Sequence, residues 1–250
     1  MNHDFFHRLS DAARAAIDLA EELEIDDKGE GDHYDPVTQA DRGAERAMRA
    51  IIERAFPDDG IWGEEFGWSR EGAARHWSID PIDGTRAFVC GLPSWAVLVG
   101  VIEKGQHVAG MIDLPDLDER LVALDGETLL NGEQVRVSDC ASLAEARIST
   151  TDPALFNDAQ HEGWQRLYAA ARLKRYGLDA MAFARVATGG LDLACDTGLK
   201  PHDYDAIVAV VRGAGGHVGN WSGGDDLSGG DVIATSSYAL YEQAIEAIRG

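Results

Sequence analysis

Apolar side chains recur at helical spacing in two segments near the start of the chain. Residues 3–24 and residues 38–56 each place apolar side chains three and four positions apart, which predicts two amphipathic helices. Pro57 ends the second helix. The segment between them, residues 26–35, is polar and contains glycine, so we expect a loop there. The chain is therefore expected to begin with a pair of helices.

The pattern becomes strand-like in the middle of the chain. Residues 95–102 and 107–114 are apolar runs on either side of the polar residues 103–106, which predicts a hairpin. Shorter strands are expected at 120–124 and 128–137. Antiparallel sheet should therefore dominate this region.

After about residue 145 the predicted strands and helices alternate. Strands are expected at 147–150, 191–195 and 232–235, and helices at 154–171, 180–188, 204–213 and 238–248. The whole pattern predicts an α+β fold in a single domain, residues 1–250. We expect two tightly packed lobes, about 1–145 and about 146–250, with the functional site between them.

Composition narrows the possible partners and the compartment. The 250 residues carry 22 Lys and Arg against 44 Asp and Glu, a formal net charge of -22, which argues against binding to nucleic acid or an anionic membrane. Three cysteines without paired spacing suit a reducing compartment. No segment reaches about 18 consecutive apolar residues. We therefore expect a cytoplasmic protein.

The most informative segment follows a short predicted strand at 77–80. It reads Asp80-Pro-Ile-Asp83-Gly84-Thr85 and offers two carboxylates three positions apart. A helix that begins at Thr85 would direct the backbone N–H groups of Gly84 and Thr85 toward an anion. The structural alternative is a turn in which an aspartate caps a helix.

Further acidic residues lie in distant segments. Glu64 follows the apolar pair 61–62, Asp41 fits a helix capping box, and Asp203 precedes an apolar helix. Taken singly, each has a structural explanation. If they converge, cations must lie between them, and carboxylate oxygens are the ligands that Mg²⁺ prefers. Divalent ions beside an activated water would form a phosphate hydrolysis site.

The order of these segments resembles the inositol monophosphatase superfamily. The matching stretches are Pro36-Val-Thr-x-x-Asp41, Gly63-Glu64-Glu65, residues 80–85, and Asp203 with Gly213-Ala-Gly-Gly216. The resemblance implies a layered α-β-α-β-α sandwich of the type that also occurs in fructose-1,6-bisphosphatase. It also implies Mg²⁺ dependence, inhibition by Li⁺, and a homodimer.

The resemblance implies a role for each acidic residue. Glu64, Asp80 and the backbone carbonyl of Ile82 would hold a first metal ion. Asp80, Asp83 and Asp203 would hold a second ion, so that Asp80 bridges the two. A third and weaker ion would bind near Glu64. Two to three Mg²⁺ ions are therefore expected.

The resemblance also implies how the substrate and the attacking water are held. Gly84 and Thr85 would bind the phosphate through backbone N–H groups. Thr85 and Glu64 would orient the water, and Asp41 would bond to the Thr85 hydroxyl. These assignments make Glu64, Thr85 and Asp41 the catalytic residues.

Two stretches resemble the histidinol-phosphate phosphatase branch, residues 80–95 and Gly-Leu-Lys-Pro-His-Asp-Tyr at 198–204. The resemblance then implies histidinol phosphate as the substrate, in histidine biosynthesis, with Asp179 and Asp196 contacting its organic part. Inositol monophosphate and a 3′-nucleotide are alternative substrates. A non-catalytic metal-binding homologue is an alternative of another class.

Overall fold

The computed structural model describes residues 1–19, 25–27 and 36–250, with backbone alone for 25–27 and 36–38. Two helices form the first layer, α1 (His3–Asp18) and α2 (Gln39–Ala55). The Asn2 side chain caps α1 by accepting a hydrogen bond from Phe5 N (3.1 Å). Both helices were predicted, although α1 ends earlier than expected, with Leu19 as its C-cap; residues 20–24 lie outside the described part.

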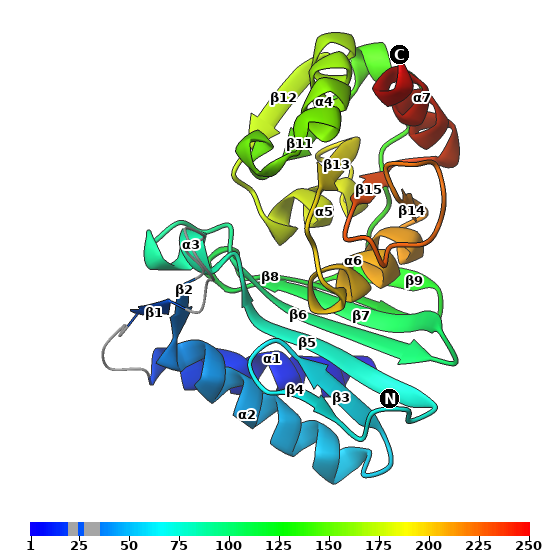
Figure 1. Cartoon of the computed structure of the whole chain (residues 1–250). Helices are drawn as coiled ribbons and strands as arrows, with labels where there is room; N and C mark the ends of the chain where they lie inside the picture. Colours follow the sequence, from blue (N-terminus) through cyan, green and yellow to red (C-terminus); the bar gives the residue numbers. More distant parts are fainter. Residues whose placement is uncertain (20–24, 28–35) are drawn as a thin grey trace.

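An eight-stranded sheet forms the second layer (Figure 1). Its strand order is β10-β9-β8-β7-β6-β5-β3-β4, and every neighbouring pair is antiparallel except β3 with β5. The strands are β3 (Gly60–Gly63), β4 (Gly67–Ser69), β5 (Arg75–Asp83), β6 (Ala96–Glu103), β7 (Gln106–Leu114), β8 (Glu119–Leu124), β9 (Glu127–Leu130) and β10 (Glu133–Gln134).

Helices cover both faces of this sheet, so β6 is buried on both sides. Val97, Val99 and Val101 pack into the core with α1 and α2, while Ala96 and Leu98 face the opposite core. This arrangement explains why the strand reads as a continuous apolar run and not as an alternation.

A third layer lies between the two sheets and contains α5 (Ala180–Ala187) and α6 (Pro201–Gly213) (Figure 1). Helix α6 packs closely on β6 because Gly100 has no side chain. A Cβ atom at Gly100 would lie 2.5 Å from the Cβ of Asp205. This close approach fixes the position of α6, which carries residues of two cavities described below.

A five-stranded mixed sheet forms the fourth layer, with the order β12-β11-β13-β15-β14. Its strands are β11 (Arg147–Thr150), β12 (Leu173–Tyr176), β13 (Leu193–Asp196), β14 (His217–Gly219) and β15 (Val232–Thr235). Helices α4 (Asp158–Ala170) and α7 (Tyr238–Arg249) pack together and form the fifth layer. The predicted α-β-α-β-α sandwich is therefore confirmed (Figure 1).

Several predicted boundaries are wrong for local reasons. The helix expected at 154–171 begins at Asp158, because Pro153–Leu155 forms a 3₁₀ turn and Asn157 forms a capping box with Gln160. The strand expected at 128–137 is broken by Asn131, whose φ of 49° belongs to a turn. The polar loop expected at 26–35 starts instead with β1 (Ile25–Asp27), which pairs with β2 (Pro36–Thr38); residues 28–35 lie outside the described part.

Other bounds also differ from the predictions. Helix α6 begins at Pro201 and not at 204, because proline suits the first position of a helix. Strand β5 is longer than the predicted 77–80, and β13 ends at Asp196. Strands β4, β12 and β14 were not predicted; β12 is largely polar and exposed and lacks an apolar pattern.

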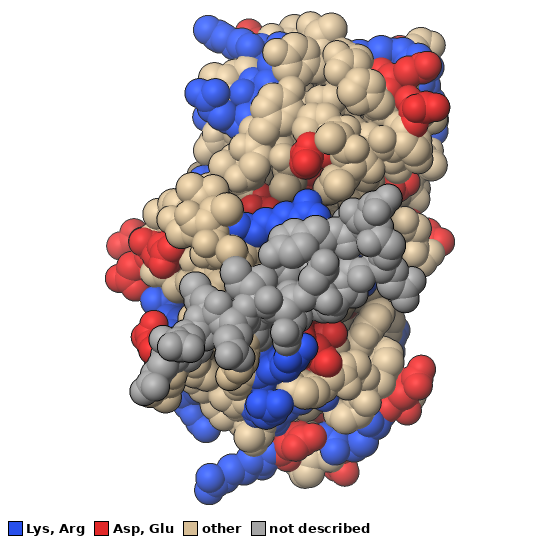
Figure 2. All heavy atoms as spheres, turned by 60° about the vertical axis from the view of Figure 1, so that its left-hand side comes forward, with Lys and Arg blue, Asp and Glu red and all other residues tan. Residues whose placement is uncertain are grey.

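The surface carries charges of both signs. On the face shown in Figure 2, acidic and basic side chains occur in several separate groups. Within the described residues, no helix is long and apolar enough to cross a membrane.

Candidate active site

The end of β5 places two aspartates beside each other. Asp80 pairs with Leu98 across the sheet and Asp83 pairs with Ala96, so the register shifts between them. The shift frees the backbone of the intervening residues, and Ile82 N donates to Asp80 Oδ1 (2.9 Å). Asp80 is 2% exposed. A bulge at the end of a strand thus directs carboxylates into one spot.

Gly84 connects this bulge to the short helix α3 (Thr85–Val89). Its φ is 76°, a left-handed conformation that favours glycine, and it is the N-cap of α3. A Cβ atom at Gly84 would lie 3.0 Å from the carboxyl carbon of Asp179. The Thr85 hydroxyl donates to the Ile82 carbonyl (3.0 Å).

Asp203 comes from the first turn of α6. Its Oδ2 accepts a hydrogen bond from Lys200 N (2.7 Å), which fixes the carboxylate at the start of the helix. One carboxylate oxygen each from Asp80, Asp83 and Asp203 lies within 4.8 Å of the others, and in the part of the chain that the structure describes these three form the group suited to hold a metal ion. The sequence-based prediction brought the same three residues together.

Asp179 and Asp83 meet at the start of α5. Ala180 N donates to Asp83 Oδ2 (2.9 Å), and the Ser94 hydroxyl donates to Asp179 Oδ2 (3.3 Å). Asp179 is the N-cap of α5 and has a φ of 47°. A residue with a side chain at positive φ is uncommon, and such conformations persist where the surroundings hold them in place.

The carboxylates of this cluster repel one another. Burial raises the pKa of Asp80 well above its usual value, and the charges of Glu64, Asp83 and Asp203 raise it further. Burial likewise raises the pKa of Asp83, together with the charges of Asp179 and Asp203. Burial and Glu64 raise the pKa of Asp203. Buried carboxylate oxygens with this much mutual repulsion fit a hard divalent cation.

One cavity of about 500 Å³ joins the cluster to its surroundings. The predicted site residues that line it are Glu64, Asp80, Ile82, Asp83, Gly84, Thr85, Asp179, Asp196 and Asp203. Asp41 is buried in the first turn of α2 and is not among the described residues that line the cavity.

Comparison with known proteins decides the family. The model of the inositol monophosphatase family matches residues 5–250. The chain belongs to this family. It is therefore a phosphatase of the inositol monophosphatase family, whose members are metal-dependent.

Relatives of this phosphatase carry several names. It is 36% identical to the bifunctional phosphatase IMPL2 of Arabidopsis thaliana, over 96% of this chain and 72% of the relative. It is 34% identical to a histidinol-phosphatase of Chlorobaculum parvum, over 85% of this chain and 83% of the relative. An inositol-1-monophosphatase of Mesorhizobium japonicum is also 34% identical, over 85% of this chain and 81% of the relative.

Solved structures confirm the fold of this inositol monophosphatase family member. An inositol monophosphatase from Zymomonas mobilis matches with a TM-score of 0.87 and 38% identity, over 99% of this chain and 97% of that one. The suhB protein of Bartonella henselae matches with a TM-score of 0.89 and 28% identity, over 98% and 97%. These relatives thus agree on the family and the fold, whereas the substrates that appear in their names are histidinol phosphate for one and inositol phosphate for others.

Glu45 supports the turn that carries Glu64 in this phosphatase, and our sequence reasoning missed it. The buried Glu45 carboxylate accepts hydrogen bonds from Glu65 N (2.7 Å) and Phe66 N (3.2 Å), and pairs with Arg49 (2.7 Å). The available signal was its position on α2, four residues after Asp41 and seven before Ile52, on the apolar face.

Asp196, at the end of β13, has both carboxylate oxygens engaged. Oδ1 accepts from the Thr150 hydroxyl (2.8 Å) and Thr151 N (2.7 Å), and Oδ2 accepts from the Thr151 hydroxyl (2.9 Å). Burial raises the pKa of Asp196 to about 6, although these hydrogen bonds act in the opposite direction. The carboxylate thus ties β13 to the end of β11 at the cavity wall.

Sequence reasoning also missed parts of the cavity wall. Arg86 is the one basic residue among the described residues that line it. Asp152 adds another carboxylate, and Leu92, Leu155 and Phe183 add apolar surface. These residues come from separate loops and helices, and no local pattern marks them.

Proposed function

We propose that this phosphatase hydrolyses histidinol phosphate to histidinol and phosphate in a Mg²⁺-dependent reaction. The observation that carries the proposal is the convergence of Asp80, Asp83 and Asp203 in a cavity that further carboxylates also line. The convergent carboxylates suit a metal-bound phosphate, and the further carboxylates suit a cationic organic group.

The residues proposed to hold two to three Mg²⁺ ions are Glu64, Asp80, Asp83, Asp203 and, through its backbone carbonyl, Ile82. Their oxygen donors, buried and mutually repelling, fit this hard cation. Bound Mg²⁺ lowers the pKa of water and stabilises charge on phosphoryl oxygens. Li⁺ is expected to inhibit at the same site.

The chain itself positions the phosphate and the attacking water in this proposal. The backbone N–H groups of Gly84 and Thr85 bind phosphate oxygens, and Glu64 with the Thr85 hydroxyl orients the water. The Thr85 hydroxyl donates to the Ile82 carbonyl in the structure. Its proposed bond to Asp41 would replace that contact.

The charge of the cavity wall supports histidinol phosphate as the substrate. Histidinol phosphate carries an amine and an imidazole, and three carboxylates, those of Asp152, Asp179 and Asp196, line the cavity with Arg86 as the basic residue among the described lining. Carboxylates bind cationic donors through charge-assisted hydrogen bonds. We propose Asp179 as the principal contact, because both oxygens of Asp196 already accept hydrogen bonds, whereas within the described residues Asp179 accepts one, from Ser94 to its Oδ2.

Inositol monophosphate is the second candidate. Carboxylates also accept hydrogen bonds from hydroxyl groups, and relatives named inositol-1-monophosphatase are as similar to this chain as those named histidinol-phosphatase. A 3′-nucleotide is the remaining alternative substrate. We further propose that the protein is a cytoplasmic homodimer. Light scattering tests the dimer by measuring the molar mass in solution.

The substrate assignment is tested by measuring phosphate release from three esters, each with and without Mg²⁺. The esters are histidinol phosphate, inositol 1-phosphate and a 3′-nucleotide. We expect the highest kcat/KM with histidinol phosphate. Asp179→Asn should raise KM for histidinol phosphate about tenfold and change KM for inositol 1-phosphate much less, since it removes a charge. A higher kcat/KM with inositol 1-phosphate would overturn the substrate assignment, and no turnover of any ester would favour a non-catalytic metal-binding protein.

A further inference from the structure

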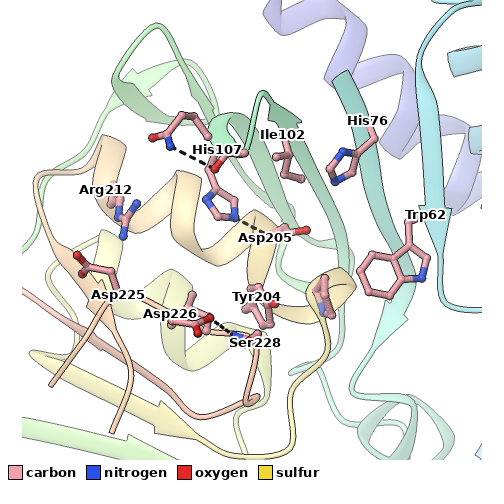
Figure 3. A pocket seen from close by; sticks show the side chains of 14 residues that line it. Trp62, His76, Ile102, His107, Tyr204, Asp205, Arg212, Asp225, Asp226 and Ser228 are labelled. Atoms are coloured by element: carbon pink, nitrogen blue, oxygen red, sulfur yellow. Dashed lines mark hydrogen bonds and ion pairs between the residues drawn. The ribbon is translucent and has the colours of Figure 1, made fainter. Parts of the chain in front are cut away.

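A second cavity of about 500 Å³ lies on the other side of α6 (Figure 3). Its walls come from the hairpin between β6 and β7, the start of α6, and residues 225–228. None of the described residues that line it also lines the catalytic cavity. The proposed phosphatase chemistry therefore leaves it unexplained.

Asp205 is built into the wall of this second cavity. It is 5% exposed, and the close packing of α6 on Gly100 fixes its backbone. His107 Nε2 donates to Asp205 Oδ1 (2.7 Å). Oδ2 has no hydrogen-bond partner within the described structure, and Figure 3 shows it directed away from His107, toward the side where Trp62 lies. Oδ2 is therefore open to a donor from a molecule bound in the cavity that Asp205 lines.

Tyr204 provides a second open acceptor. It is 8% exposed and lines the cavity, and its hydroxyl makes no hydrogen bond to any described residue. Asp225 and Asp226 lie at the opposite wall, and Asp226 accepts a hydrogen bond from Ser228 N (3.0 Å). The described lining residues thus include three carboxylates, those of Asp205, Asp225 and Asp226, and one arginine, Arg212.

The remaining wall is apolar and aromatic. Trp62, Ile102, Pro201 and Leu227 all line the cavity. Aromatic rings attract cations through their faces, and apolar walls favour a ligand with a carbon skeleton. His76, His107 and Asp205 do not converge closely enough to form a metal site, since the group of described residues suited to a metal ion is Asp80, Asp83 and Asp203.

We propose that this second cavity binds a small organic ammonium ion. Its N–H groups donate to Asp205 Oδ2 and to the Tyr204 hydroxyl, and its carbon skeleton packs against Trp62. Trp62 lies two residues before Glu64 in sequence, and Tyr204 follows Asp203. The bound ion would therefore contact two segments that also supply the catalytic cavity.

Isothermal titration with 2-phenylethylammonium tests the proposal, and 2-phenylethanol serves as the neutral ligand of the same shape. The full-length protein is saturated with Mg²⁺ and inorganic phosphate, so that the catalytic carboxylates are already engaged. We expect the ammonium ion to bind at least about tenfold more tightly than the alcohol, as a charge-assisted hydrogen bond provides. Equal affinities, or no binding of either ligand, would overturn the proposal.

Three variants locate the binding. Asp205→Asn should weaken binding of the ammonium ion at least about tenfold. Asp179→Asn in the catalytic cavity and Glu242→Gln on the exposed surface of α7 remove the same charge elsewhere and should leave the affinity unchanged. Unchanged affinity in Asp205→Asn, or a loss in Asp179→Asn alone, would contradict this location.

A further variant covers the case in which Asp205→Asn does not fold, as judged by circular dichroism. Tyr204→Phe keeps the ring and removes only the hydroxyl, and should weaken binding about fivefold or more. In that case, an unchanged affinity in Tyr204→Phe would overturn the proposal.

Discussion

The Asp83 carboxylate accepts a hydrogen bond from the backbone N–H of Ala180, 97 residues later in the chain (2.9 Å). Asp83 ends a strand of the large sheet, and Ala180 begins a helix that packs between the sheets. The bond therefore joins the acidic cluster to the wall that carries Asp179. Its geometry shows that the candidate site forms only when both halves of the chain are folded together.

Replacement of Asp83 tests its proposed role as a metal ligand. Asp83→Asn keeps an oxygen that accepts from Ala180 N but removes a charge from the cluster, so we expect a folded protein whose kcat falls more than about a hundredfold. Phosphate release at saturating Mg²⁺ measures the effect, and the circular dichroism spectrum controls for folding. Wild-type turnover in this variant would refute the role of Asp83.

The raised pKa values of Asp80 and Asp83 predict a pH-dependent response of stability to Mg²⁺. Without metal, the folded state holds protons on these groups that the unfolded state releases, so stability falls as pH rises from about 4 through the raised pKa values. Mg²⁺ replaces those protons. We expect Mg²⁺ to raise Tm by at least about 5 °C at pH 8 and by less at pH 5.

Thermal melts in EDTA and in excess Mg²⁺ at the two pH values measure this difference. Ca²⁺-free buffer and constant ionic strength provide the control, because screening by salt alone acts on all surface charges. An equal shift of Tm at pH 5 and pH 8 would show that Mg²⁺ does not bind at these carboxylates.

Glu45 is predicted to position the turn that carries Glu64. Glu45→Gln weakens the bonds to Glu65 N and Arg49, so we expect a loss of about 1–3 kcal/mol in the free energy of unfolding and a raised half-saturating Mg²⁺ concentration. Chemical denaturation and Mg²⁺ titration of activity measure both effects. Glu53→Gln, on the same helix but exposed, should change neither.

The pKa of Asp196, which is raised to about 6, leads to a separate prediction for the pH dependence of the free energy of unfolding. The folded state binds a proton on Asp196 more tightly than the unfolded state does, which stabilises the folded state at a pH below the unfolded pKa of Asp196. This stabilisation is lost as the pH rises from about 4 through 6. Asp196→Asn has no such titration. The stability of the wild type relative to this variant should therefore fall by about 3 kcal/mol across that window.

Urea denaturation at pH 4, 5, 6 and 7 measures this difference for both proteins. Because Asp196 is buried and its oxygens have partners, solvent screening should affect the result little. A constant difference across the window would show that Asp196 titrates as an exposed carboxylate does.

The sequence predicted the acidic cluster because Asp80, Asp83 and Gly84 lie in one short segment whose residue types match one chemistry. The resemblance to the inositol monophosphatase superfamily implied the metal role of Asp203, since its place before an apolar helix also suits an N-cap. The resemblance likewise implied the layered sandwich, and the switch between sheet-like and alternating patterns agreed with it. Both depend on residue types in short segments and on the order of those segments, which the sequence displays directly.

Other features of both cavities could not be predicted, because they depend on contacts between distant segments. In the second cavity, Asp205 and His107 are 98 residues apart, and α6 packs on Gly100 where they meet. Helix α6 begins before the predicted start, because Pro201 occupies the first helical position and precedes the apolar residues that mark the helix in the sequence. Arg86 and Leu155 meet at one cavity through tertiary structure alone.

We propose that the converging carboxylates bind divalent ions and that these ions make phosphate hydrolysis possible. The most direct measurement is turnover of histidinol phosphate after removal of divalent ions by EDTA and again after Mg²⁺ is restored. We predict no measurable phosphate release in EDTA and full recovery with Mg²⁺, both in the same preparation. Undiminished turnover in EDTA would show that hydrolysis does not depend on divalent ions.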